Sequence, residues 1–430
     1  MTCRVKLIGF FLILMSLREL RADEFDFDED LDDVSAESTE VNEPPKPAFQ
    51  LPFRGHLGLT MGRQTGRPVR WIAQSADLNL ILDWKSPFGQ VYGEGSGAWN
   101  QAWKTEDDPQ PLTDHYTKDG LLRELWWSGT HKRATLYLGR QIVVLGKGDF
   151  LSVLDLVSPG DQTRLFFADP EDARLGQDLI RLNVYPVAGH ELSVMYSPSA
   201  RSGRYPSHGH PYQQFPDYDR DEPKRLNESV LLYRYHSEHL DLSVCGGRVH
   251  QRTPVLSVDL SQGVIKGSHE PFSFYGIGLS RALTGWLLKA ELALYQDYAF
   301  QKDGFFETRD VHVAMIGFDY LHDQLGSFTA EGNVIRPVDR DRSEDDRSLY
   351  ALSWTDTWLR DDLSLSLVHM GFKRFRNQLN RLHLSYRIND DWTVEGQYTH
   401  LSIKDQEFKA FEHVDRMDLR LKYGFSLSDG

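Results

Sequence analysis

The sequence contains no run of eighteen apolar residues, so we expect no transmembrane helix. Only 40% of the residues are hydrophobic, and the mean hydropathy is -0.48. Cysteine is nearly absent, since Cys3 and Cys245 are the only two. Cys3 falls in a segment that we expect to be cleaved. The mature chain would then carry one thiol and could not close an internal disulfide.

Motifs that carry enzyme chemistry are also missing. There is no Gly-x-Ser-x-Gly, no phosphate-binding loop and no Cys-x-x-Cys. His208 and His210 fall in a polar segment that is typical of a surface loop. Ser366 with His369 is the one pair that would suit a barrel-type hydrolase. We therefore expect no enzyme, no cofactor and no metal site, and keep hydrolysis as a lesser alternative.

The first 22 residues have the three parts of a secretory signal peptide. Arg4 and Lys6 supply the basic start, residues 7–17 are apolar, and Leu20-Arg21-Ala22 is an acceptable cleavage site. A short buried helix is the alternative. The pattern predicts a signal peptide over residues 1–22 and export from the cytoplasm.

Residues 23–50 form a second segment of unusual composition. Positions 23–47 hold eleven acidic residues, one lysine and three prolines. A chain of this charge cannot bury a core, so we expect a disordered tail, placed in the periplasm. A docking segment for a basic periplasmic partner is the alternative. The whole chain has a formal net charge of -15, which argues against a nucleic-acid partner.

From Phe53 onward the hydrophobic pattern has a period of two. Leu78, Leu80 and Leu82 alternate with polar residues, and residues 414–425 alternate in the same way. Such strands bury one face and leave the other in water. Aromatics make up 12% of the chain and gather near the expected turns, as at Trp84 and Trp392. That placement is typical of membrane–water boundaries.

About eighteen strands can be counted, with centres near residues 57, 78, 92, 125, 138, 182, 193, 232, 243, 276, 291, 315, 330, 353, 366, 382, 397 and 419. Tight turns alternate with longer connections, expected at 62–70, 100–119, 146–176, 199–226, 250–271, 298–308, 336–346 and 404–411. A short link near residue 374 is the exception. This alternation predicts an all-β fold over residues 51–430, a transmembrane antiparallel β-barrel of the bacterial outer membrane. A sandwich or propeller is less suitable, because no blade repeat is visible.

The alternation also predicts which side chains of each strand face the lipid and which face the lumen. Leu292 and Leu365 are assigned to the lipid face, and Glu291 and Ser364 to the opposite face, where replacement should cost less. Outer-membrane lipid, lipopolysaccharide and the barrel-assembly machinery are the partners that such a barrel implies. The last strand ends in alternating aromatics, as the assembly signal of such barrels does.

Residues 146–176 interrupt the alternation and form the third long connection. They combine turn residues, apolar anchors and mixed charge, which predicts an ordered loop folded into the lumen. Their charged side chains would line a pore constriction: Asp149, Asp155, Asp161, Arg164, Asp169, Glu171, Asp172 and Arg174. Alternatively, Asp155, Asp172 and Arg174 form salt bridges that hold the loop itself.

Basic residues on the inward faces of the strands would form a lumen wall opposite this acidic loop. They are Arg181, Arg234, Arg381, Arg387, Arg416, Arg420 and Lys422. A transverse field of this kind would orient polar or zwitterionic solutes. Mutual bracing of the wall is an equal alternative.

The segment around the loop resembles a known family. The matching residues are Gly139-Arg140-Gln141, Gly146, Asp149, Leu154-Asp155, Ser158-Pro159, Asp161, Asp169, Glu171-Asp172, Arg174 and Tyr185-Pro186. These residues resemble a family of large proteobacterial outer-membrane barrels whose shared domain has no assigned function. Genes for RND-type exporters often lie near that family, so the resemblance implies a role in exporting lipidic or hydrophobic molecules.

These observations together predict an outer-membrane channel with porin-like architecture. It would pass small or lipidic solutes, either passively or coupled to an inner-membrane exporter of the RND type. A structural or adhesive barrel with a plugged lumen is the alternative.

Overall fold

The computed structural model describes residues 52–66, 69–101, 118–163, 172–206, 219–220, 226–259, 263–302, 305–338, 347–372, 376–405, 412 and 415–426. The predicted signal peptide and acidic tail lie outside these residues. Within the described part of the chain, no helix has the length and apolar character that a membrane span requires.

Eighteen strands form one sheet. Their bounds are β1 Phe53–Gln64, β2 Arg70–Ser86, β3 Gly89–Asn100, β4 Lys118–His131, β5 Ala134–Gln141, β6 Gln177–Val184, β7 His190–Ser197, β9 Glu228–His236, β10 Leu240–His250, β13 Pro271–Leu283, β14 Trp286–Lys302, β15 Phe305–His322, β16 Gly326–Pro337, β17 Arg347–Trp358, β18 Leu363–Phe372, β19 Asn377–Arg387, β20 Trp392–Ser402 and β21 Arg416–Ser426. Each of the eighteen expected centres falls inside one of them.

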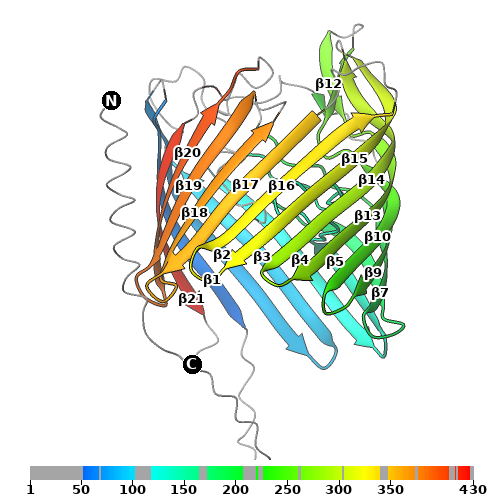
Figure 1. The fold of residues 1–430 in the computed structure, drawn as a ribbon, viewed down its shortest axis with the longest axis horizontal. Coiled ribbons are helices and arrows are strands. Elements are labelled where there is room, and N and C mark those ends of the chain that lie inside the picture. Colours follow the sequence, from blue (N-terminus) through cyan, green and yellow to red (C-terminus); the bar gives the residue numbers. More distant parts are fainter. Residues whose placement is uncertain are drawn as a thin grey trace, which may run out of the picture.

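The sheet closes on itself, because β1 pairs with both β2 and β21. Leu57 lies opposite Leu78 on one side and opposite Tyr423 on the other. All the pairings around the ring are antiparallel, and Figure 1 shows the tilted strands of the resulting barrel. The prediction of an all-β antiparallel barrel with eighteen strands is confirmed.

Short turns lie at one end of the barrel and longer connections at the other (Figure 1). The structure differs from the expectation in two places. Strands β14 and β15 keep pairing beyond residue 298, after an irregularity in register between Tyr295 and Tyr298, so only residues 303–304 separate them. Two of the expected long connections, 199–226 and 250–271, contribute a second, three-stranded sheet of β8 Asp219–Arg220, β11 Val255–Asp259 and β12 Val264–Ser268.

The two faces of the barrel wall differ sharply. On β15, Ile316 is 72% exposed on the outer face, whereas Val313 on the inner face is 2% exposed. Aromatics gather on the outer face near the short turns. Trp286 lies against Tyr320, with ring centroids 4.3 Å apart, and Trp392 lies against Tyr423. Amphipathic rings at this level are typical of a lipid–water boundary.

The main apolar core lies inside the barrel. Leu145, Leu151, Val153 and Leu154 of the third long connection are buried there. They pack on inner-face residues of the surrounding strands: Leu179, Met195, Val230, Leu232, Cys245, Val249, Phe272, Phe274, Ala293, Tyr295, Phe300, Val311, Val313, Met315 and Ala351. The core therefore fixes an inward connection against the wall formed by β6 to β17.

Candidate pore constriction

The third long connection, residues 142–176, is called the inward loop below. Its most concentrated attachment is the carboxylate of Glu291, which is completely buried on the inner face of β14. Oε1 accepts the backbone N–H groups of Lys147 and Gly148, the latter at 2.9 Å. Oε2 accepts those of Val153 and Leu154, at 2.7 and 3.0 Å, and the Ser152 hydroxyl. One carboxylate thus satisfies donors that would otherwise be buried without partners.

A second carboxylate, Glu331 of β16, holds the middle of the same segment. It accepts the backbone N–H groups of Asp149, Phe150 and Leu151 at 2.7, 3.0 and 2.9 Å. Lys289 compensates the charge: its Nζ lies 2.7 Å from an Asp149 carboxylate oxygen and 3.9 Å from Glu331. The loop is therefore attached to the wall through its backbone, independently of the side chains that it presents.

The loop is also braced internally. Oδ1 of Asp155 accepts the N–H groups of Leu145 and Gly146, both at 2.8 Å, and Oδ2 lies 2.9 Å from Nη2 of Arg174. Arg252 donates from the wall side to the carbonyl oxygens of Leu156 and Val157. These contacts hold the described parts of the loop together inside the barrel.

Because the loop packs on β6 to β17, the opposite part of the lumen stays open. A cavity of about 600 Å³ lies between the loop and the wall of β1 to β4 and β19 to β21. Charged residues line it from both sides: Asp77, Glu94, Asp119, Arg123, Asp161, Asp172, Arg204, Glu395, Arg416, Asp418, Arg420 and Lys422. Charged and polar side chains from both the loop and the wall border this open space, as in a pore constriction.

The loop side of the cavity presents Asp161 and Asp172. Arg204 lies 3.0 Å from Asp161 and 2.8 Å from Asp119, so it links the loop region to β4. Arg123 pairs with Glu94 at 2.9 Å and lies 3.9 Å from Asp172, whose side chain is 68% exposed. Among the loop carboxylates that the structure describes, Asp172 is therefore the most open to a solute.

The wall side presents the cations of β21. Arg420 lies 2.7 Å from Asp77 of β2, and this ion pair spans β1 at the closure of the barrel. Arg416 pairs with Asp418 on its own strand at 2.6 Å. Lys422 also lines the cavity. Acid and base are therefore paired within the wall, and the loop adds carboxylates opposite it.

The structure brings five of the predicted site residues together around this cavity: Asp161, Asp172, Arg416, Arg420 and Lys422. Other predicted residues have different places. Asp155 and Arg174 pair within the loop, and Asp149 pairs with Lys289. Arg164, Asp169 and Glu171 lie outside the described residues.

The remaining wall residues lie away from the cavity. Arg181 stacks over the Tyr137 ring at 4.1 Å, and Arg234 donates to the Val144 carbonyl at 2.7 Å. Arg234 borders a second cavity of about 630 Å³ on the short-turn side of the loop. Arg381 lies opposite Val368 on β18, and Arg387 pairs with Asp362 at the short-turn rim. Pore roles for the four arginines stay predictions.

The hydrolase alternative does not agree with the geometry. Ser366 and His369 are three residues apart on β18, and side chains with odd separation point to opposite faces of a strand. Ser366 accepts a hydrogen bond from Thr355, whereas His369 bonds Tyr350 and Asn380. The two groups cannot act on one another, so this pair supports no hydrolysis.

Sequence patterns missed the two anchoring carboxylates. Glu291 and Lys289 are the charged residues in an otherwise apolar stretch, WLLKAELALY, and both face inward. That contrast was a usable signal. The sequence around Glu331, Asp77 and Arg123 contains no comparable signal, because isolated charges on the inward face of a barrel strand are common.

Comparison with known proteins gives a fold relationship. No family model and no curated protein matches the chain. Among solved structures, it is similar to OccAB4 of Acinetobacter baumannii, with TM-score 0.51, 8% identity, and coverage of 88% of this chain and 98% of that one. It is likewise similar to Pseudomonas aeruginosa OpdK with vanillate, with TM-score 0.50, 13% identity, and coverage of 87% of this chain and 98% of that one. A BenF-like porin of Pseudomonas fluorescens Pf-5 matches with TM-score 0.51, 10% identity, and coverage of 88% of this chain and 98% of that one. At such identities the likeness concerns the fold.

Proposed function

We propose that this protein is a channel of the Gram-negative outer membrane that passes small polar solutes. One observation carries the proposal. The inward loop is attached by its backbone to one side of the lumen and leaves a charged cavity of about 600 Å³ on the other side. An outer face of exposed apolar residues with aromatics near the short turns is what a lipid bilayer requires.

The similar structures support the same conclusion. One is described as a porin, and the OpdK structure contains vanillate, a small molecule. The chain covers nearly the whole length of each, so the channel architecture is compared as a unit. We infer that this barrel also passes solutes of small size.

The lining argues for polar rather than lipidic solutes. Carboxylates of Asp161 and Asp172 face the cations of Arg416, Arg420 and Lys422 across the cavity. An apolar molecule would have to remove water from these charged groups, which is costly even where the charges are paired. A solute with both signs of charge, or with several hydrogen-bonding groups, would replace the lost water. We therefore favour polar and zwitterionic solutes.

Orientation follows from the connections. Outer-membrane barrels have short turns on the periplasmic side and long loops outside. Strand β1 begins at the short-turn end, which supports placing the acidic tail in the periplasm. Coupling to an RND-type exporter, and membership of the family that residues 139–186 resemble, remain hypotheses that rest on the resemblance.

Purified protein in planar bilayers tests the proposal. We expect discrete conductance steps, and swelling of protein-containing liposomes in small amino acids or sugars that stops for large oligosaccharides. A heat-modifiable, folded barrel that gives no conductance and no swelling would instead support the plugged structural or adhesive barrel.

A further inference from the structure

The outer face of the barrel carries a groove that the channel does not use. It has a volume of about 770 Å³ and runs over β10 and β13 to β16. The outward-facing side chains that line it are mainly apolar: Val244, Tyr275, Ile277, Leu292, Leu294, Ala314 and Val334, with His312 and Arg336. Exposed Ile277 and Leu292 assign it to the face that contacts lipid.

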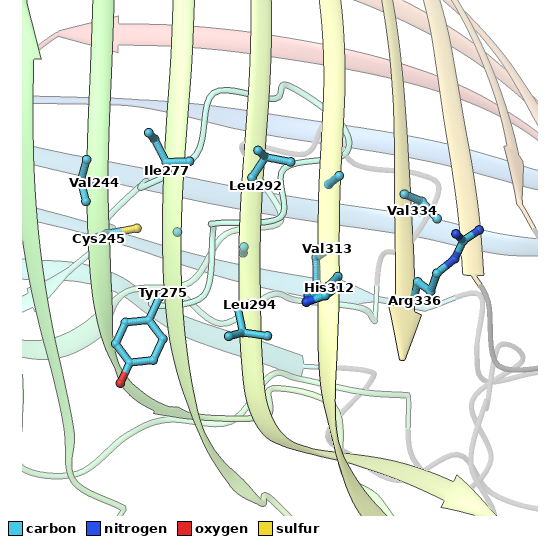
Figure 2. A pocket seen from close by; sticks show the side chains of 13 residues that line it. Val244, Cys245, Tyr275, Ile277, Leu292, Leu294, His312, Val313, Val334 and Arg336 are labelled. Carbon is cyan, nitrogen blue, oxygen red and sulfur yellow. The ribbon is translucent and has the colours of Figure 1, made fainter. Parts of the chain in front are cut away.

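The groove has a polar end and an apolar end. Figure 2 shows Tyr275, His312 and Arg336 toward the end to which strand β16 points, and Val244, Ile277 and Leu292 toward the other. Strand β16 ends at Pro337 beside the long connections. The polar end therefore lies on the long-loop side, which is the outer side in the proposed orientation.

The level of the polar end can be estimated along β15. Tyr320 belongs to the aromatic group near the short turns, and His312 lies eight residues further along. At about 3.3 Å per residue and a tilt of about 45°, this is roughly 19 Å along the membrane normal. His312 thus lies near the far edge of an apolar band about 25 Å tall. Other polar groups on the outer face, Tyr350 and His369, also lie toward the long connections.

Two basic side chains meet at this edge. His312 and Arg336 are direct cross-strand partners, so their Cβ atoms lie about 5 Å apart, and both are exposed. Arg248 of β10 is a further exposed cation, on the other flank of Tyr275. Asp310 is the nearest acid on β15, and its carboxylate accepts the N–H of Asp297. A guanidinium facing lipid at this depth is suited to a phosphate group.

We propose that this groove binds one phosphorylated lipid of the outer leaflet, the lipid A part of lipopolysaccharide, with a phosphate at Arg336 and His312 and an acyl chain along Leu292, Leu294 and Ala314. Charge complementarity at one end and the apolar lining at the other select such an amphiphile. The small side chain of Ala314 leaves room for the chain. This inference rests on the proposed membrane location and orientation but not on channel activity.

Native mass spectrometry of detergent-purified protein titrated with purified lipid A tests it. We expect one lipid A per barrel, and at least tenfold weaker binding for the double variant Arg336→Gln, His312→Gln and for Ala314→Phe, which fills the groove. Arg387→Gln, at the short-turn rim, is the matched control and should bind as the wild type does. If Ala314→Phe lacks heat-modifiable mobility and has therefore not folded, Val334→Phe is used to fill the groove instead.

Three results would overturn the inference. Unchanged affinity in the double variant removes the phosphate contact. Unchanged affinity for lipid A in Ala314→Phe would show that the acyl chain does not lie in the groove. Equal competition by inorganic phosphate would show an anion site without a lipid. Because binding is measured without ion flow, a barrel that fails to conduct can still confirm the lipid site, and a conducting barrel can still refute it.

Discussion

Gly148 and Glu291 lie 143 residues apart in the chain, yet the Gly148 N–H donates to Glu291 Oε1 at 2.9 Å. The same carboxylate holds both ends of the turn from Lys147 to Leu154. Together with Glu331 and the apolar core, it holds the inward loop on one side of the lumen and leaves the cavity on the other.

Glu291→Gln should loosen the loop. The amide would place a donor against backbone donors, and each buried N–H left without an acceptor costs about 1–3 kcal/mol. We expect larger and noisier single-channel currents in planar bilayers, with the barrel still folded. Glu238→Gln makes the same chemical change at an exposed short-turn position and should leave the currents unchanged. Identical traces for both variants would exclude the anchoring role.

Asp161→Asn with Asp172→Asn should move ion preference toward anions. These are the described loop carboxylates that line the cavity, and fixed charges in a constriction select counter-ions. The reversal potential under a KCl gradient measures the shift. It should shrink toward 1 M salt, where screening shortens the reach of a charge to about 3 Å.

Asp155→Asn is the control for that shift. Asp155 bonds Leu145, Gly146 and Arg174 within the loop rather than lining the cavity. We expect altered open-channel noise and thermal stability with little change in selectivity. A selectivity change as large as that of the double variant would mean that the loop carboxylates act together.

Neutralising the basic residues of the wall should shift the ion preference in the opposite direction. Arg416, Arg420 and Lys422 line the cavity from β21, so their replacement by Gln should move preference toward cations. Arg387→Gln, at the rim beside Asp362, should have no such effect in the same measurement. If the rim variant shifts the reversal potential equally, the selective step lies outside the cavity.

A charge placed on the outer face of the barrel should destabilise it most near the middle of the membrane. Ile316→Arg places a charge midway between Tyr320 and His312, where we expect a loss of about 2–4 kcal/mol in unfolding from liposomes. Ile316→Leu should be nearly neutral. A small loss for the arginine variant would mean that this face does not contact the hydrocarbon core.

Cys245 offers a probe of the interior. Its side chain is 5% exposed and belongs to the core that the inward loop completes. A maleimide should not modify it in the folded barrel, and labelling should appear together with the loss of heat-modifiable mobility. Rapid labelling of folded protein would show that the loop leaves the wall.

The barrel can be predicted from the amino-acid sequence. Side-chain alternation is a local property of an extended chain, so the faces of β2 and β21 follow from residues near one another. Turn and loop lengths then ordered the eighteen strands, because antiparallel neighbours need only short connections. The same alternation already separates Ser366 from His369.

The side of the lumen on which the loop lies could not be predicted in this way, because it depends on contacts between residues far apart in the chain. Alternation placed Glu291 on the tolerant inner face, but it accepts five hydrogen bonds from the loop, so we expect its replacement to cost more than alternation alone predicts. Arg420 with Asp77 and Arg204 with Asp161 likewise join distant segments. Such contacts form only where the packed loop meets the closed wall. A local sequence pattern does not encode which distant residues meet there.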